Sequence, residues 1–532
     1  MPSIFRVVVW LLALRVVLAE LEDDDFEESC PIGSPSCGAS EADEGTIVSH
    51  HRLHSWESPV PMKRSHIWPM ARGPAGSATT SPYTASRDFK SSLAWKWTPP
   101  EGRWSGTSTG AILIDDEMNV YVQFTRGLHK FNADGELKWH YPGCVQDVPA
   151  LMDDDVYGYT CDGTLFAVNL ETGEEKFKVK LHENNVSRDI AATGAIDGVI
   201  ISRGHSRPGG GARHIFGANA TDGKVLWEFI PYNLVWSFVP IFTETRDSFV
   251  FQDQIGGVYH IRIDGQLLWT SGYRGQEAET WADGGCILGA NKMVYVVHAD
   301  MKMHRVLKHN NKHSTGDIIA YRLRDGKKVW RQPVPLPPQS WPAVARLHDE
   351  GDPLVILPIG SQPYSPVDHV LIDKWKFHHL FHPLFFQWLH AFYHKVSLWL
   401  GTWSRFMWWH RTYPSSVWAF DAETGEFRWK WDAPTWLRGM AAGDEEGLLH
   451  GRKCLPNPWG SPTVDAAGTI FTGHMNGKIY ALWDEDNDDI ISANEFSEYD
   501  AEAAFNHPGP AIAPGMMAVA SCESLFVFRG SS

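Results

Sequence analysis

The sequence predicts an all-β fold, an eight-bladed β-propeller with a helical insertion in its sixth repeat; a seven-bladed ring is the alternative. Two observations predict this fold. From Leu93 onward, short alternating apolar segments recur, each followed by a glycine turn and a strand that ends in an aromatic residue. The copies recur about every 40 residues, which is the length of one four-stranded propeller blade.

The closing aromatic residues mark the successive copies. Each follows a turn such as Asp-Gly or Thr-Gly, which signals a hairpin because glycine adopts a positive φ at little cost. The copies end at Trp97, Trp139, Phe177, Trp227, Trp269, Trp330 and Trp429. We expect these rings to pack between neighbouring blades, since large rigid side chains used this regularly serve a repeated packing role.

The two ends of the repeat region complete each other. Residues 510–529 supply inner strands without a final Trp-containing strand, and Leu93–Trp97 supplies that strand from the N-terminal side. The eighth blade is therefore expected to be shared by both ends. Such closure removes exposed strand edges.

The segments Ala419–Trp429 and Ala167–Gly173 carry the pattern Ala-x-(Asp/Asn)-x-x-Thr-Gly, which is completed by x-x-x-Trp in the first. This pattern resembles the pyrroloquinoline-quinone (PQQ)-type β-propeller repeat over residues 93–529. Propellers of that class include quinoprotein alcohol dehydrogenases, which bind PQQ and calcium. They also include non-catalytic scaffolds, such as the bacterial outer-membrane assembly lipoprotein and the lumenal sensor of an unfolded-protein-response kinase.

The cysteines bear on which of these functions the resemblance implies. The dehydrogenases carry two adjacent cysteines that form a disulfide over the quinone, whereas the seven cysteines here are all separated in sequence. No residue of this chain matches a catalytic Asp or a quinone-stacking Trp of that class. The resemblance therefore favours a non-enzymatic protein-interaction scaffold without PQQ, and a PQQ-dependent oxidoreductase is the alternative.

The N-terminal region differs in composition from the repeats. Residues 1–19 are predicted to be a signal peptide, with Arg6, an apolar run over 7–14 and Ala19 before the cleavage site. An uncleaved short anchor is the alternative. Residues 20–90 are acidic and then rich in Ser, Gly and Pro, which predicts a disordered linker before the propeller domain of residues 91–532.

Cysteine content and charge narrow the location and the partners. Seven cysteines fit an oxidising compartment, and the candidate pairs are Cys30 with Cys37 and Cys144 with Cys161. With the signal peptide, they predict the lumen of the secretory pathway or the extracellular space. The formal net charge of −17 argues against a nucleic-acid partner, because phosphate binding needs concentrated positive charge.

The seventh repeat has an acidic segment, residues 484–495, where the others have a glycine turn. It resembles the twelve-residue EF-hand calcium loop, whose spacing arranges oxygen ligands around one cation. The predicted calcium ligands are Asp484, Asp486, Asp488, the carbonyl of Ile490, Ser492 and Glu495. Asp489 replaces the usual glycine at position 6, which predicts backbone strain and lower affinity. A strand is expected before the loop and a helix over 496–505 after it; a solvated acidic loop is the alternative.

The sixth repeat is interrupted by residues 366–414, which match no blade pattern. Residues 384–409 have helical periodicity and a wide apolar face that suits a membrane interface or a protein surface. The residues predicted to contact a membrane surface are Phe385, Leu389, Phe392, Val396, Trp399 and Trp403. His390 and His394 stand one helical turn apart, a spacing that can hold zinc, but a polar stripe is the favoured interpretation. The protein partner cannot be named from the sequence.

Overall fold

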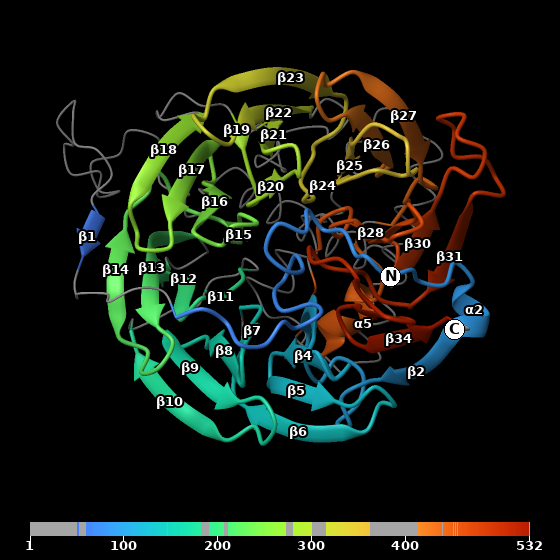
Figure 1. Ribbon diagram of the computed structural model, residues 1–532. Helices are drawn as coiled ribbons and strands as arrows, with labels where there is room; N and C mark the ends of the chain where they lie inside the picture. Colours follow the sequence, from blue (N-terminus) through green and yellow to red (C-terminus); the bar gives the residue numbers. More distant parts are fainter. Residues whose placement is uncertain are drawn as a thin grey trace, which may run out of the picture.

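Eight antiparallel sheets surround a common axis, as the ring in Figure 1 shows; seven are built on four strands that follow one another in the chain, and the eighth joins β2 to the last three strands. The computed structural model describes residues 50–52, 60–145, 147–181, 191–206, 211–272, 280–300, 315–361, 412–438, 440–450, 452, 454 and 456–530. The predicted all-β propeller is confirmed, and its blade number is eight rather than seven.

The first four blades follow one another in the chain. Blade 1 is β3 (Ser108–Ile114), β4 (Val120–Phe124), β5 (Gly127–Phe131) and β6 (Leu137–Pro142). Blade 2 is β7 (Ala150–Met152), β8 (Asp155–Tyr159), β9 (Thr164–Asn169) and β10 (Glu175–Lys180). Blade 3 is β11 (Gly194–Ile196), β12 (Val199–Ser206), β13 (Ala212–Asn219) and β14 (Val225–Phe229), and β1 (His50–Arg52) pairs with its outer edge. Blade 4 is β15 (Ile241–Phe242), β16 (Ser248–Gln252), β17 (Gly257–Arg262) and β18 (Leu267–Gly272).

The remaining blades complete the circle. Blade 5 is β20 (Ile287–Leu288), β21 (Met293–Asp300), β22 (Gly316–Arg322) and β23 (Lys328–Val334), with β19 (Thr280–Trp281) added to β21. Blade 6 is β24 (Ala343–Ala345), β25 (Leu354–Gly360), β26 (Ser415–Asp421) and β27 (Phe427–Asp432). Blade 7 is β28 (Thr463–Val464), β29 (Ile470–Gly473), β30 (Lys478–Leu482) and β31 (Phe496–Asp500). Blade 8 is β32 (Ala511–Ala513), β33 (Met516–Ala520), β34 (Leu525–Arg529) and β2 (Leu93–Trp97), and the two short helices are α2 (Phe89–Ser92) and α5 (Asp444–Leu449).

The ring closes as the sequence predicts, since β2 pairs with β34 and places Trp97 opposite Leu525. Burial differs systematically across a blade. Middle strands such as β4 and β5 are buried throughout, whereas the outer strand β6 alternates between exposed and buried residues. Middle strands are covered by the neighbouring blades on both faces, so even His129 and Lys130 of β5 are buried, and the outer strand meets more solvent.

The repeat glycine and the repeat tryptophan form one contact between blades. Trp139 donates its indole N–H to the carbonyl oxygen of Leu170 in the next blade at 3.1 Å, and a Cβ atom on Gly173 would lie 2.8 Å from the Trp139 ring. The same relationship recurs at Trp330 with Ala422 and Gly425. These rings therefore join neighbouring blades, which explains the regular tryptophan spacing.

Blade 8 departs from the expected position of this contact. Trp95, rather than Trp97, donates to the carbonyl of Ala133 at 2.9 Å and lies against Gly135. Trp95 follows the register shift in the pairing of β2 with β34, as Trp139 follows the shift in the pairing of β6 with β5, so Trp95 holds the repeat position that the spacing assigns to Trp97. Trp97 packs instead against aromatic side chains of blade 1.

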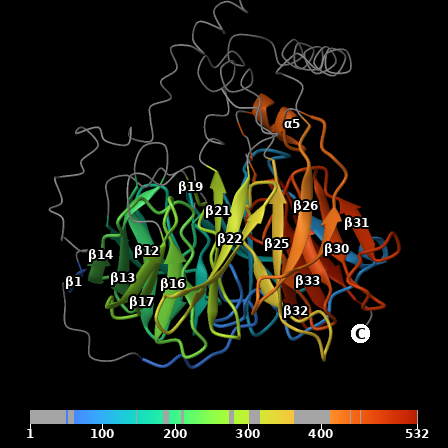
Figure 2. The ribbon, with the colours of Figure 1, turned by 90° about the horizontal axis from the view of Figure 1, so that it is seen from above.

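The prediction of a disordered linker over 20–90 is wrong for residues 60–88, which we call the strap. Hydrogen bonds join it to several blades: Trp68 pairs with Ile114, and Gly76 donates to the carbonyl of Phe242. Figure 2 shows the strap along the face of the ring opposite α5. Trp68 and Met70 are buried, and their irregular spacing gives no periodic signal of this packing.

One predicted disulfide is present and a second had no sequence signal. Cys144 is bonded to Cys161 as expected, and Cys454 is bonded to Cys522 across 68 residues of chain. Cys286 is a buried free thiol. In the described ranges, no helix is long and apolar enough to cross a membrane.

Several predictions lie outside the described residues. They concern the signal peptide over 1–19, the acidic segment after it, Cys30 and Cys37. Residues 362–411, which hold the expected helix over 384–409, also lie outside. These assignments stay predictions.

Candidate metal centre

The acidic segment forms the loop that connects β30 to β31. Leu482 pairs with Phe496 at the base of this hairpin, so two strands flank the loop where an EF-hand has two helices. The strand before the loop was expected. The helix expected over 496–505 is wrong, because Phe496–Asp500 pairs with β30 as the outer strand that blade 7 requires, and residues 501–505 form no helix.

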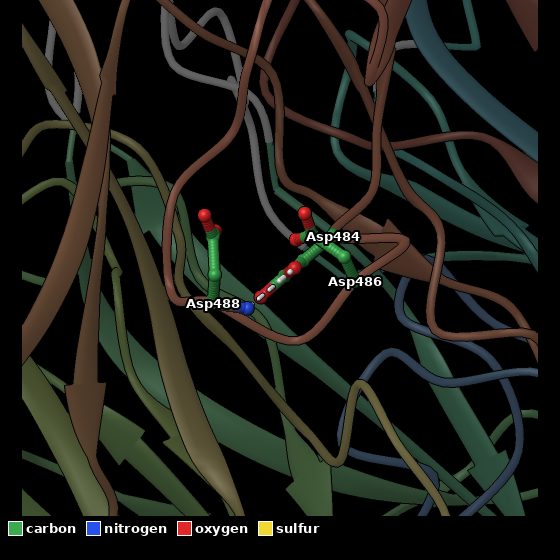
Figure 3. A group of neighbouring side chains, drawn as sticks. All are labelled: Asp484, Asp486 and Asp488. Atoms are coloured by element: carbon green, nitrogen blue, oxygen red, sulfur yellow. Dashed lines mark hydrogen bonds between the residues drawn. The ribbon is translucent and has the colours of Figure 1, made fainter.

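Three of the predicted ligands lie close together. One carboxylate oxygen each of Asp484, Asp486 and Asp488 lies within 4.8 Å of the other two. Asp484 is the buried member, and its two oxygens accept the backbone N–H groups of Asp488 at 3.2 Å and Asp489 at 3.1 Å. Figure 3 shows the loop turning around Asp484, with the bond from Asp488 dashed.

Glu495 and Ser492 close the other end of the loop. Glu495 is only 2% exposed; one carboxylate oxygen accepts the N–H of Glu485 at 2.7 Å, and the other accepts the N–H and hydroxyl of Ser492 at 2.8 and 2.6 Å. Glu495 thus holds the two ends of the loop together and is not within the group of three Asp carboxylates. Ile490 is exposed, whereas Ile491 packs into the core beside Trp429.

The backbone at position 6 of the loop takes the conformation that glycine usually provides. Asp489 has a φ of +62°, and Asn487 has a φ of +59°. Non-glycine residues with short polar side chains adopt this region at some energetic cost. The Asp489 carboxylate pairs with Arg428 of blade 6 at 3.0 Å, which anchors this turn to the neighbouring blade.

The charges of the loop repel one another. Partial burial and the nearby carboxylates of Asp488, Glu495 and Asp484 raise the pKa of Asp486. Glu495 has a lowered pKa because the hydroxyl and N–H of Ser492 and the N–H of Glu485 donate to it. A cation among the aspartates would relieve the repulsion, and carboxylate oxygens are the ligands that calcium prefers.

Two further side chains at this loop had no signal in the sequence. Arg428 comes from blade 6, and His348 lies 3.8 Å from the Asp484 carboxylate. Both approach from outside the repeat that contains the loop. A sequence pattern read along one segment does not reveal such neighbours.

A cluster of buried polar side chains around Asp283 is the second candidate for a ligand site. There the Asp283 carboxylate accepts hydrogen bonds from Ser237 and Asn457 and lies 2.5 Å from Nε2 of His507. The rings of His507 and Trp341 have their centroids 5.4 Å apart, and Trp341 is fully buried. These polar groups contact one another, whereas Nδ1 of His507 is buried without a hydrogen-bond partner in the described structure. No two cysteines of the sequence are adjacent.

Comparison with known proteins agrees with this architecture. A family model described as "Outer membrane protein assembly factor BamB" matches residues 128–283. The structure of BamB from Moraxella catarrhalis has 13% sequence identity and a TM-score of 0.50, with 82% of this chain and 99% of that chain covered. No curated protein sequence matches the chain.

Two quinoprotein structures share the fold. Quinohemoprotein alcohol dehydrogenase from Comamonas testosteroni has 12% identity and a TM-score of 0.54, covering 88% of this chain and 82% of that chain. A europium-containing methanol dehydrogenase also has 12% identity and a TM-score of 0.54, covering 88% of this chain and 99% of that one. The chain therefore shares the β-propeller fold of these proteins. At such low identity, these similarities establish the fold alone.

Proposed function

We propose that this propeller is a non-enzymatic protein-interaction scaffold of the secretory pathway or the extracellular space, with one calcium ion bound in blade 7. The convergence of Asp484, Asp486 and Asp488 on one point carries the calcium part of the proposal. The scaffold part is supported by the similarity to BamB, which is described as an outer membrane protein assembly factor. It is also supported by the hydrogen bonds that join Asp283, Asn457 and His507 to one another.

Calcium would act as a structural clamp. The loop spans the two outer strands of blade 7, and Arg428 ties it to blade 6. An ion that neutralises the aspartates would therefore stabilise both the hairpin and the blade contact. We expect the ion to bind the three aspartates first, with Ser492, the carbonyl of Ile490 and a reoriented Glu495 completing the ligand set.

Thermal unfolding with and without calcium tests this site. Calcium should raise the melting temperature, because a ligand that binds only the folded state stabilises it by about 2.7 kcal/mol at a hundredfold excess over Kd. The double variant Asp484→Ala/Glu495→Ala should lose the shift. Glu485→Gln is the matched control, since Glu485 pairs with Arg87 and is not a proposed ligand.

Terbium luminescence gives an independent readout. Trp483 directly precedes the loop and can sensitise a terbium ion bound there. Titrated calcium should quench this emission in the wild type and in Glu485→Gln. A calcium-dependent melting shift that survives unchanged in the double variant would show that calcium binds elsewhere.

Deletion of the insertion, residues 366–414, tests whether it carries the surface that binds a partner. Affinity capture by the full chain and by a chain lacking residues 366–414 should differ if the insertion carries the interaction surface. Flotation with liposomes distinguishes membrane attachment through residues 384–409 from protein binding. Quinone absorbance and alcohol-dependent dye reduction after addition of PQQ and calcium would overturn the non-enzymatic assignment.

A further inference from the structure

The strap places a buried positive charge, that of Arg72, beside Trp341. Arg72 is only 5% exposed, and its guanidinium lies over the ring of Trp341, 5.3 Å from the ring centroid. The side chain belongs to neither the calcium loop nor the Asp283 network. Transfer of an isolated charge out of water is costly, so buried charges are normally paired.

Most of the hydrogen-bonding capacity of Arg72 is unused. A guanidinium has five N–H donors. Its Nη2 donates to the hydroxyl of Thr79 at 3.2 Å and to the carbonyl of Pro342. Its Nε and Nη1, which carry the other three N–H bonds, are buried without an acceptor in the described structure. No carboxylate of the described residues forms a salt bridge with it within 4.0 Å.

The neighbouring ionisable groups cannot supply the missing negative charge. Burial raises the pKa of the Cys286 thiol to about 12, so this group is neutral at pH 7. Asp283 accepts the indole N–H of Trp341 through its backbone carbonyl, but Ser237, Asn457 and His507 already occupy its carboxylate oxygens. Burial also lowers the pKa of Arg72 to about 9, which leaves it protonated at neutral pH.

Space for a ligand exists beside this side chain. Arg72 lines a pocket between the strap and the inner strands of blades 3 to 5, where Thr193, Ile241 and Ile287 form part of the wall. The described wall has no acidic side chain, so nothing in it repels an anion. Its polar groups are uncharged apart from Arg72.

We propose that Arg72 holds a small inorganic anion, of which chloride is the simplest, in this pocket. The anion would accept the unused N–H bonds and neutralise the buried charge. Because Arg72 belongs to the strap, the bound anion would also fasten the strap to the ring. This site is independent of the calcium loop.

Halide dependence of stability tests the proposal on the full chain. The melting temperature in sodium chloride should exceed that in sodium gluconate at equal ionic strength, because gluconate is too large for the pocket, and it should rise with chloride concentration. Arg72→Met keeps an unbranched apolar stem, removes the charge and should lose this dependence. Arg64→Met is the matched control, since Arg64 lies on the same strap but pairs with Asp116 and Asp154.

A direct readout covers the case in which Arg72→Met fails to fold. Crystals of the wild type grown in sodium bromide should show an anomalous peak within hydrogen-bonding distance of the Arg72 nitrogens. Water at that place, with equal melting temperatures in chloride and gluconate, would overturn the proposal. Retention of the chloride effect by Arg72→Met would overturn it as well.

Discussion

The indole ring of Trp139 covers Gly173, a residue of the next blade that has a φ of +70°. Glycine is needed here for two reasons. A side chain would be strained by the positive φ, and its Cβ would lie 2.8 Å from the ring. The Thr-Gly turn and the closing tryptophan of the repeat are therefore two halves of one inter-blade contact.

Gly173→Ala should destabilise the protein more than Gly515→Ala. Gly515 has a φ of +64° with open space around its Cβ position, so alanine there meets only the backbone cost, which is about 1 kcal/mol. Alanine at 173 adds the clash with Trp139, and overpacking of this kind costs ~1–3 kcal/mol more. Urea unfolding of both variants measures the difference; equal losses would show that the ring moves aside freely.

Stability should fall as the pH decreases from about 6.5 to about 4. Burial is the main cause that lowers the pKa of four histidines: His129, His260 and His298 to about 4, and His474 to about 3. In this window the unfolded chain binds protons that the folded protein does not, so each histidine contributes a slope of at most ~1.4 kcal/mol per pH unit.

Asp253 acts in the opposite direction, because burial raises its pKa to about 6. Asp465 and Asp486, whose pKa values are also raised, act as Asp253 does. Carboxylates with lowered pKa values, such as Asp247 and Asp283, act with the four histidines, so the net slope stays positive. Chemical unfolding at pH 7, 6 and 5 measures it. His474→Gln should reduce the slope of the free energy of unfolding against pH by the contribution of one histidine. A free energy of unfolding that is independent of pH would contradict the burial of these rings.

The sequence predicts what is local and periodic in this fold. Asp-Gly and Thr-Gly turns, closing aromatics and the shared eighth blade could be read from spacing, because each blade repeats the same local interactions. The strap could not, since Trp68 and Met70 are buried by surfaces from several blades and follow no period. The pairing of Arg428 with Asp489 depends on the ring geometry, which brings two blades together.

The structure brings together three of the proposed calcium ligands and separates Glu495 from them, for a similar reason. The spacing of Asp484, Asp486 and Asp488 brings their carboxylates together within one turn. The position of Glu495 depends on how the loop closes between two strands, and the EF-hand pattern assumes two helices.

Asp489→Gly and Asp489→Ala should have opposite consequences for the calcium loop. Glycine adopts the positive φ of this position without strain. The strain energy removed offsets the loss of the partly exposed ion pair with Arg428, which contributes ~0.2–1 kcal/mol. Alanine loses the same pair and keeps the strain, so it should be less stable than the glycine variant by ~1 kcal/mol. Calorimetric titration should also show tighter calcium binding for Asp489→Gly than for Asp489→Ala. Equal stability and affinity of the two variants would exclude strain at this position.

The two disulfides should contribute unequally to stability. Cys454–Cys522 closes a loop with a sequence separation of 68, and Cys144–Cys161 one with a separation of 17. In the chain-entropy description, these lengths correspond to ~4 and ~3 kcal/mol, because a longer loop restricts the unfolded chain more. The longer loop also joins the segment beside α5 to blade 8, next to Glu523, whose carboxylate pairs with Arg103. Cys454→Ala/Cys522→Ala should therefore lower the melting temperature more than Cys144→Ala/Cys161→Ala. Thermal unfolding of both double variants measures the order, and the reverse order would mean that native packing around Cys144, rather than loop length, controls the contribution.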